Sequence, residues 1–508
     1  MPDLHLLIGL VPLLPLLAAA WIGINMAVGS QRGETGEKPT ALIASIASGG
    51  TLLLLAIIGL ISLFNGAPGE ITLGNWLEVG NYHISISFLL DGFALLTAIT
   101  VALIAFLSIR FSVNYLHREA GFQRFFLFMC LFNGAMLLIV MAGSAPLMFI
   151  GWELAGVSSY LLIAYAYQRR IATENANRAF ITNRIGDAGF ILGIFFSFAW
   201  LGSADWQDMS RAASHTEHVY DTLIMAGFLI AALAKSAQIP FSGWIARALE
   251  GPTPSSAVFY GSLMVHAGVY LLIRLEAVIL QAPVLMLVLT GLGLITALYG
   301  WLCSLVQTDV KSSFMFSTTA QTGLMFMACG LGWFDLVKWY LPLHMIWRAW
   351  QFLHAPSLMH MVHGRPKPVP RWLRHNAWLY NAALRRFWLD QISDATLLKP
   401  TRSLAVDAQN FDEHIVNRMV GLPNKHALLD TDGTAGSVGQ GRGVIGRLME
   451  VVAQALHWFE DHLILKGGGE GLIAGIQHVG KYMQQVEILL SQPRYLILLI
   501  AVTFVVVI

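Results

Sequence analysis

The sequence predicts an all-α polytopic membrane protein, a helix bundle in which one helix is broken. Two observations predict this class. Hydrophobic residues make up 56% of the 508 residues and charged residues only 12%, a composition that soluble globular proteins of this length do not have. Apolar stretches of about 20 residues, long enough to cross a bilayer, also follow one another as far as residue 363. The formal net charge of +1 gives no indication of nucleic-acid binding.

Eleven apolar stretches are predicted to span the membrane. They lie near residues 4–27, 41–64, 88–111, 124–142, 146–167, 178–201, 221–240, 254–279, 283–305, 312–332 and 336–360. The first lacks the basic start and cleavage site of a signal peptide, so we expect it to be retained. Between the second and third stretches, residues 71–88 alternate apolar and polar side chains around Gly80 and Asn81. This alternation predicts an exposed β-hairpin.

The basic residues between the stretches predict the topology, because Lys and Arg near helix ends mark the cytoplasmic side. They follow the first, third, fifth and eleventh stretches, whereas the loop after the sixth is acidic. We therefore expect the N-terminus outside the cell. The basic residues are Arg32, Lys38, Arg118, Arg169, Arg170, Arg365, Lys367, Arg371 and Arg374.

Three regions are predicted: a membrane bundle at 1–363, a cytoplasmic or interfacial region at 364–487 and a last membrane helix at 488–508. The middle region begins Pro-rich and contains amphipathic segments such as 384–394 and 444–460, separated by a Gly-rich linker at 430–443. Such amphipathic helices lie on a bilayer or against partner helices. This region is therefore the predicted docking site for a partner.

A lysine and a proline stand close together in the seventh stretch. Lys235 lies in an otherwise apolar run, and Pro240 follows five residues later. A charge at mid-bilayer costs about 2.5–3.5 kcal/mol on insertion scales, so an intramembrane lysine indicates function. Proline breaks the helix, and the freed carbonyls must be satisfied by protein or water. We predict a broken helix with charge and water meeting inside the membrane.

Other ionisable side chains in the stretches predict a proton relay with Lys235. Glu153 is the only carboxylate of the fifth stretch. Burial favours the neutral form of an amine and a nearby carboxylate favours the charged form, so movement of Glu153 relative to Lys235 would switch the proton affinity of the lysine. The other predicted members are His266, Lys311 and His344.

Each group also has a structural interpretation. Glu153 could join helices by hydrogen bonds, His266 could be a buried core histidine, and Lys311 could be an interfacial residue that snorkels. Arg184 and Asp187, three residues apart on one helical face, can neutralise each other and are predicted to support the relay electrostatically. The co-occurrence of Glu, Lys and Pro favours the functional interpretation.

Cofactor chemistry is not expected within this chain. Cys130, Cys303 and Cys329 lie in apolar runs without metal-ligand spacing. The chain also lacks a Cys/His/Asp set suited to catalytic zinc and any flavin, quinone or iron–sulfur signature. We expect a transporter subunit rather than an enzyme.

Six motifs together resemble the antiporter-like subunit of respiratory complex I, the chain called L or 5, and the related multisubunit cation/proton antiporters. They are Gly151–Ile163, Asn183–Asp187, Ala234–Pro240, Gly251–Ala257, Met264–Tyr270 and Asp309–Gly323. The resemblance covers about residues 85–350. It implies two inverted five-helix repeats, each with a broken helix, around a polar axis.

The resemblance also implies roles for individual residues. Glu153 matches the coupling glutamate of the family, Lys235 its broken-helix lysine and Lys311 its central lysine. Arg184 and Asp187 match the polar pair beside them.

The sequence departs from the family pattern in three places. Tyr260 stands where the family has a histidine, with His266 displaced along the helix. Arg348 stands four residues after His344 where a lysine is expected, and arginine does not readily release a proton. After residue 363 no second broken helix follows, so the second inverted repeat is predicted to be truncated.

A shortened subunit of this kind resembles the membrane subunit of DAB-type inorganic-carbon accumulation complexes in the bacterial inner membrane. That resemblance implies a large cytoplasmic zinc protein, similar to β-carbonic anhydrase, as partner, with zinc held by the partner. Proton or sodium influx through the membrane subunit would then energise conversion of carbon dioxide to bicarbonate.

Two alternatives remain at this point. One is a proton-pumping subunit of a complex I-like or hydrogenase-like respiratory complex. The other is a structural anchor whose former channel is inactive.

Overall fold

The computed structural model describes residues 2–29, 33–79, 82–213, 218–361 and 369–412, with a few isolated residues further on. They belong to two units, residues 1–399 and residues 400–508. The second unit is described mainly as α18 (Lys399–Phe411). The predicted linker at 430–443, amphipathic helix at 444–460 and terminal helix at 488–508 lie outside the described residues.

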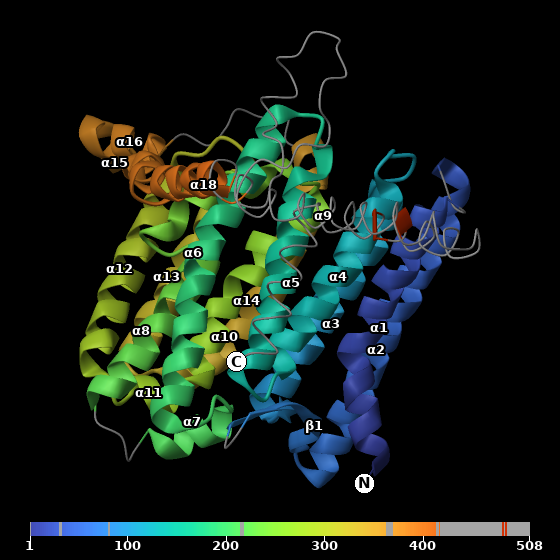
Figure 1. Cartoon of the computed structure of the whole chain (residues 1–508). Helices are drawn as coiled ribbons and strands as arrows, with labels where there is room; N and C mark the ends of the chain where they lie inside the picture. Colours follow the sequence, from blue (N-terminus) through green and yellow to red (C-terminus); the bar gives the residue numbers. More distant parts are fainter. Residues whose placement is uncertain are drawn as a thin grey trace, which may run out of the picture. The chain divides into compact units, whose positions relative to one another are not determined.

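The first unit is a bundle of long helices, with α1 and α2 at one edge and α12 and α13 at the other (Figure 1). Its first half contains α1 (Pro2–Val28), α2 (Glu37–Asn65), α3 (Gly92–Tyr115), α4 (Phe122–Met141), α5 (Ala145–Ile163), α6 (Arg170–Leu201), α7 (Trp206–Ala212) and α8 (His218–Lys235). Its second half contains α9 (Thr253–Ser256), α10 (Ala267–Arg274), α11 (Glu276–Ile279), α12 (Pro283–Leu305), α13 (Val310–Gly330) and α14 (Phe334–Met361).

Each of the eleven predicted spans contains helix. Within the described ranges, nine helical stretches have the length and mean hydropathy of a membrane span. The helices α13 and α14 fall outside these nine, because polar residues such as Gln321, Thr322, His344 and Arg348 lower their mean hydropathy. The helical membrane class is confirmed.

Two ends of the bundle are distinguished by what they carry (Figure 1). The hairpin end carries the β-hairpin, α7 and α11. The basic end carries Arg118, Arg169, Arg178 and Arg247 in and beside the connections between helices. The basic end is the one predicted to face the cytoplasm, and this orientation stays a prediction.

The predicted β-hairpin is present, as β1 (Gly69–Val79) paired antiparallel with β2 (Tyr82–Leu90). The prediction that it is exposed holds only in part. Trp76 of β1 is 58% exposed, whereas Phe88 and Leu90 of β2 are buried. The apolar end of β2 is buried because it packs where α4 meets α5. This end of the hairpin belongs to the core, whereas most of β1 is exposed.

Extended backbone on both sides holds the short connection between α4 and α5. Gly143 N donates to Ser87 O at 2.8 Å, and Trp206 N donates to Gly143 O at 3.0 Å. A Cβ atom at Gly143 would lie 2.4 Å from Ser87 Oγ. The connection is therefore locked between β2 and the start of α7, and only glycine fits there.

The predicted break in the seventh span is confirmed. The helix α8 ends at Lys235, Ala237 has φ +51°, and Pro240 follows before a 3₁₀ turn, η3 (Phe241–Trp244). The carbonyl of Ala234 accepts from Trp244 Nε1 at 2.9 Å. Protein groups thus satisfy a carbonyl that the break frees, as a helix interruption inside a bilayer requires.

The eighth span differs from the regular helix expected at 254–279. A π-helical turn at Ala257–Ser262 (η5) and a 3₁₀ turn at Met264–His266 (η6) separate α9 from α10. Tight packing accompanies the irregularity: a Cβ atom at Gly268 would lie 2.4 Å from Ala232 O. Single π-turns inside helices are frequent at functional sites, and this one immediately precedes His266.

After α14 the chain forms short helices rather than a second set of long ones in residues 369–399. These are α15 (Arg371–His375), α16 (Ala377–Leu384), η7 (Arg386–Trp388), α17 (Leu389–Ser393) and η8 (Asp394–Leu398). Figure 1 shows α15 and α16 across the end of α12. The amphipathic helix predicted at 384–394 is interrupted, because Arg386, Phe387 and Trp388 all have positive φ.

Asp91 generates a prediction about acid stability. It caps α3 just outside the membrane span, accepts from Ala94 N at 2.7 Å, and forms a bidentate ion pair with buried Arg274. Burial raises the pKa of the Asp91 carboxyl, but hydrogen bonds and positive charge from Arg274 outweigh burial and hold this pKa below its usual value. A lowered carboxyl pKa adds stability above the unfolded value near 3.9, and this stability is lost as the pH falls through the folded value.

Asp91→Asn keeps the helix cap and removes the charge. We expect it to lower the free energy of unfolding at pH 7 by about 1–2 kcal/mol, less than the usual 3–5 for a broken buried pair, because Asp91 is 44% exposed. The difference from wild type should begin to shrink as the pH falls below about 4 and should vanish once the pH lies below the folded pKa of Asp91. Thermal unfolding in detergent measures it. Asp335→Asn, at a 96% exposed side chain, is the control, and an equal effect there would contradict the prediction.

Candidate functional site

Glu153, Arg184 and Asp187 form an ion-pair cluster between α5 and α6. Arg184 contacts Glu153 through one guanidinium nitrogen, and another lies 2.8 Å from Asp187 Oδ2. The Asp187 side chain is only 4% exposed, so its charge must be balanced within the protein. The Arg184–Asp187 pairing predicted from sequence is present, and Arg184 also holds Glu153.

Lys235 lies at the broken end of α8 beside this cluster. It is 1% exposed, its Nζ donates to Trp152 O at 2.9 Å, and Nζ lies 5.0 Å from the centroid of the Trp152 ring. Trp152 Nε1 in turn donates to Asp187 Oδ1 at 2.7 Å. Trp152 therefore links the lysine to the carboxylate through its carbonyl, ring and indole N–H.

Sequence reasoning missed the role of Trp152. The available signal was its position next to Glu153 in an apolar run. Trp152 has no role among the sequence-based predictions, because indole contacts between helices cannot be inferred from helical spacing.

Close helix packing makes room for the two cations. A Cβ atom at Gly156 would lie 2.8 Å from Arg184 Nη2 and 3.4 Å from Lys235 Nζ. At Gly186 it would lie 2.4 Å from Ala234 Cβ. Glycine on α5 and α6 thus lets both cations and α8 approach these helices closely.

The expected pairing of Glu153 with Lys235 takes a different form. Among the described contacts, Glu153 is paired with Arg184, and Lys235 hydrogen-bonds to Trp152 O. The physical reason is that an arginine fork can bind two carboxylates at once, so Arg184 takes the partner expected for the lysine. Any influence of Glu153 on Lys235 acts through Arg184 and Asp187.

A second cluster joins His266 to His344 and Arg348 of α14. The His266 Nε2 and His344 Nδ1 atoms are 2.8 Å apart, and Arg348 Nε donates to His344 Nε2 at 3.1 Å. The Nε2 atom of His344 accepts the hydrogen bond from Arg348, so in the neutral ring the proton of His344 lies on Nδ1. This N–H is donated to His266 Nε2. Arg348 also donates to Ser317 Oγ at 2.6 Å. The sequence-predicted histidines are thus brought into direct contact.

Polar groups of the broken segment lie between the two clusters. Gln238 Nε2 donates to Ser236 O at 2.8 Å and to Thr322 Oγ1 at 3.2 Å. Ser236 Oγ and Gln238 Oε1 are buried and make no hydrogen bond to any described residue. Ser236 packs beside Gly268, two residues after His266. Sequence reasoning named neither Gln238 nor Thr322, although both lie in the quoted motifs.

Lys311 lies apart from both clusters. It is in the first turn of α13, whose N-cap is Asp309, and it is partly exposed. Ser317, the residue of α13 that contacts Arg348, is six residues further on, or about 9 Å along the helix axis. The position matches the interfacial interpretation of Lys311 rather than that of a central lysine.

Tyr260 occupies the position where a histidine was expected. It is fully buried, and its hydroxyl donates to Ser256 Oγ. Its ring packs edge-on against Phe352. The side chain is therefore satisfied locally and takes part in neither cluster.

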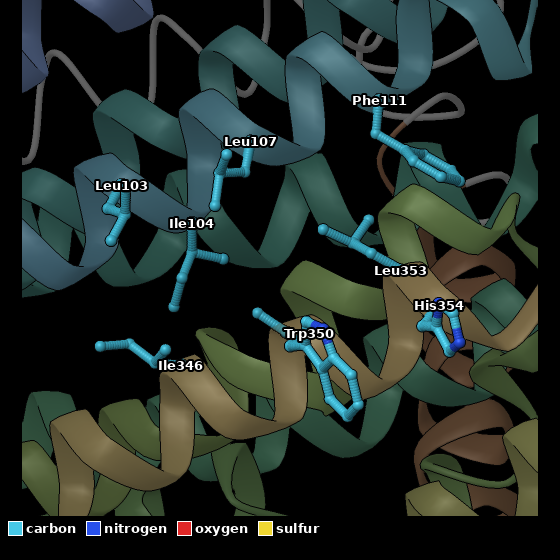
Figure 2. Close-up of a pocket in the computed structure, with 9 residues that line it drawn as sticks. Leu103, Ile104, Leu107, Phe111, Ile346, Trp350, Leu353 and His354 are labelled. Carbon is cyan, nitrogen blue, oxygen red and sulfur yellow. The ribbon is translucent and has the colours of Figure 1, made fainter.

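An apolar pocket between α3 and α14 is not part of the site. Figure 2 shows its lining, which includes Leu107, Ile346, Trp350 and His354, and the cavity volume is about 420 Å³. His354 is the only titratable residue of that lining. Such a pocket offers too few polar groups to hold an ion.

Metal binding has no evident place in the described ranges. They contain no group of three His, Cys, Asp or Glu side chains arranged to hold a metal ion. Cys130, Cys303 and Cys329 are buried and unpaired.

Two family models match the sequence. Residues 142–367 match the model described as NADH:quinone oxidoreductase/Mrp antiporter, TM, and residues 76–126 match NADH-Ubiquinone oxidoreductase (complex I), chain 5 N-terminus. NADH-ubiquinone oxidoreductase chain 5 of Allomyces macrogynus is 34% identical over 69% of this chain and 54% of its own length. NAD(P)H-quinone oxidoreductase chain 5 of Synechocystis sp. is 31% identical over 71% and 54%. The chain thus spans about half the length of these relatives.

Solved structures share the fold. The Mrp complex from Dietzia sp. DQ12-45-1b has a chain with a TM-score of 0.61 and 22% identity, covering 73% of this chain and 40% of that one. The membrane-bound sulfane sulfur reductase, an archaeal respiratory membrane complex, has one with a TM-score of 0.58 and 19% identity, covering 70% and 57%. At these identities the likeness concerns the fold alone.

Arg184→Gln tests the electrostatic role of this arginine. It removes the cation that contacts both Glu153 and Asp187 and leaves Lys235 as the remaining cation nearby. We therefore expect the free energy of unfolding to fall by about 2–4 kcal/mol, as when one partner of a buried ion pair is removed. Arg170→Gln removes an arginine from an exposed pair with Glu174 and should cost about 0.5 kcal/mol at most. Thermal unfolding of both variants in detergent compares them, and similar losses would contradict the assigned role.

Proposed function

Because this chain belongs to the complex I antiporter-like superfamily, which includes chain 5 of quinone oxidoreductases and Mrp-type antiporters, we propose that it is the cation-conducting membrane subunit of a larger redox-driven complex. Protons are the proposed cation, because lysine and histidine side chains at membrane depth exchange protons. The redox chemistry would lie in partner subunits.

The main support for this proposal is a fully buried lysine at the broken end of a membrane helix. The ammonium of Lys235 donates a hydrogen bond to the carbonyl of Trp152. The indole N–H of the same tryptophan donates a hydrogen bond to Asp187. Intramembrane ionisable residues at helix breaks typically mark ion pathways. Two carboxylates and two cations gather here, so gain or loss of one proton changes the charge of the cluster from neutral to ±1.

A route for protons continues from Lys235 along the broken segment. Buried polar atoms without a protein partner are normally satisfied by internal water, which makes Ser236 and Gln238 the proposed hydrated link. Beyond them, the contact of His266 with His344 provides a proton path through two imidazoles. Arg348 keeps its proton and acts as a fixed charge at the end of this path.

The relatives favour a respiratory type of complex over the inorganic-carbon complex preferred from sequence. The two family models match residues 76–126 and 142–367, which include both clusters, and the similar relatives are quinone oxidoreductase subunits. We therefore propose that electron transfer in partner subunits drives proton movement through this chain. A purely structural anchor is less consistent with two intact clusters of contacting ionisable groups.

A second candidate is the membrane subunit of an inorganic-carbon accumulation complex with a zinc-binding, carbonic-anhydrase-like partner. The observation that favours it is the change in architecture after α14, where residues 371–399 lie across the basic end instead of beginning another repeat. Such a surface would suit a large partner on that side. Zinc would then be held by the partner.

Replacing Lys235 tests conduction. We expect Lys235→Met in the intact complex to reduce proton flux into inverted membrane vesicles roughly 100-fold, because loss of the charge carrier raises the barrier by about 3 kcal/mol. A pH-sensitive dye measures the flux. Lys311→Met is the matched control and should retain most of the flux, because Lys311 lies at the start of α13. Wild-type flux in Lys235→Met would establish the anchor instead.

Purification of the complex through a tag on this chain distinguishes the two candidate complexes. We expect flavin or iron–sulfur subunits to co-purify, detected by mass spectrometry and by visible absorption of the cofactors. A stoichiometric zinc protein without iron would instead support the inorganic-carbon complex.

A further inference from the structure

The short helices after α14 touch the broken segment through one carboxylate. Asp390 of α17 accepts from Arg247 Nη2 and from Arg386 Nη1, each at 3.1 Å. Its side chain is only 14% exposed. Arg247 belongs to the connection that follows the break in α8, so Asp390 ties residues 371–399 to that connection.

Backbone packing strengthens this tie. A Cβ atom at Gly243 would lie 3.4 Å from both Asp390 Oδ1 and Ser393 Cβ. The turn η3, which contains Gly243, therefore lies directly against α17. A shift of α17 cannot occur without a shift of this turn or the loss of the contact.

The same turn reaches Lys235 by one further hydrogen bond. Trp244 is 2% exposed, and its Nε1 donates to Ala234 O at 2.9 Å. Ala234 is the residue before Lys235. The physical connection from Asp390 thus runs through Arg247 and Trp244 to the last turn of α8.

The connection between α8 and α9 has little regular structure of its own. It contains the turn η3 and a second short 3₁₀ turn, η4 (Ala248–Glu250). Its backbone hydrogen bonds are local ones, such as Arg247 N to Trp244 O and Ala248 N to Ile245 O, so its position against the bundle depends on tertiary contacts. Without Asp390, Arg247 and Arg386 would be left as two like charges close together, which disfavours the observed position.

We propose that Asp390 is a positioning residue for Lys235, through which residues 371–399, and any subunit bound to them, control the broken end of α8. The proposal rests on the proposed function of Lys235 as a proton carrier. It assigns residues 371–399 a role in conduction beyond covering the basic end of the bundle.

The chain itself supplies a matched control. Asp394, four residues after Asp390, pairs with Arg178 of α6 at 2.7 Å. This second pair anchors the same short helices to the bundle, but to α6 rather than to the broken segment. If Asp390 only anchored these helices, loss of either aspartate would have the same effect.

The charged and titratable surroundings of both groups are known. Asp390 faces Arg247 from the broken segment and Arg386 from η7, with Tyr299 and Cys303 of α12 nearby. Lys235 faces Asp187 and Arg184 of α6. Asp394 is paired with Arg178. Neutralising Asp390 leaves the groups that face Lys235 unchanged. Asp394→Asn removes the same charge from the same short helices, so comparison of the two variants separates an effect of position from an effect of charge.

The experiment compares Asp390→Asn, Asp390→Glu, Asp394→Asn and Lys235→Met in the intact complex. Proton flux into inverted vesicles is measured from pH 5.5 to 9 and normalised to the amount of assembled complex. We expect Asp390→Asn to lose roughly tenfold or more in flux, since small misplacements of reacting groups lower rates by up to about 100-fold. We also expect its pH profile to shift, because the surroundings of Lys235 change. Asp394→Asn should keep the wild-type profile, and Asp390→Glu should recover much of the flux.

Equal normalised flux and equal profiles in Asp390→Asn and Asp394→Asn would overturn the inference, because Asp390 would then be an anchor only. The Lys235→Met arm separates this outcome from failure of the proposed function. If Lys235→Met keeps its flux, the proposed function is wrong. If Lys235→Met loses flux while Asp390→Asn does not, the inference alone is wrong.

Discussion

The requirement that charge within the bilayer be balanced determines the arrangement of α5, α6 and α8. Glu153 and Asp187 supply two negative charges, and Arg184 and Lys235 supply two positive ones. Because isolated charges are so costly in this medium, the three helices must bring these groups into contact, and glycines at the crossings permit it. The indole of Trp152 fills the remaining space while donating to Asp187. The close packing of α5, α6 and α8 and the pairing of their charges therefore depend on each other.

The two clusters differ in how their charges and hydrogen bonds are arranged. In the first, acids and bases share their charges through Arg184, so the charge state of one member affects all the others. In the second, Arg348 donates to His344, which fixes the direction of the hydrogen bond to His266. The broken segment lies between these environments, and its polar side chains belong to neither. This position explains why a connection without regular helix is retained at membrane depth, where irregular backbone is otherwise excluded.

Much of the fold could be predicted from sequence, because long apolar stretches, alternating residues and a proline after Lys235 report local structure directly. The contacts within the site were less predictable. The choice of Arg184 rather than Lys235 as partner of Glu153 depends on the spacing of three helices, which no single segment encodes. The π-turn at Ala257–Ser262 was not predicted, because the apolar run at 254–279 has the pattern of a regular helix. The tie between Asp390 and Arg247 joins residues more than 140 positions apart, and neither has a sequence pattern that marks it.

The locked connection between α4 and α5 has a mechanical consequence. Gly143 forms backbone hydrogen bonds with β2 on one side and with the start of α7 on the other. The connection that precedes α5 is therefore fixed in position. Glu153 lies less than three helical turns after Gly143, so its backbone has little freedom to move relative to β2 and α7. The helix that carries Lys235 is instead interrupted directly after this residue, so a change in the separation of Glu153 and Lys235 would come more readily from that break than from the start of α5.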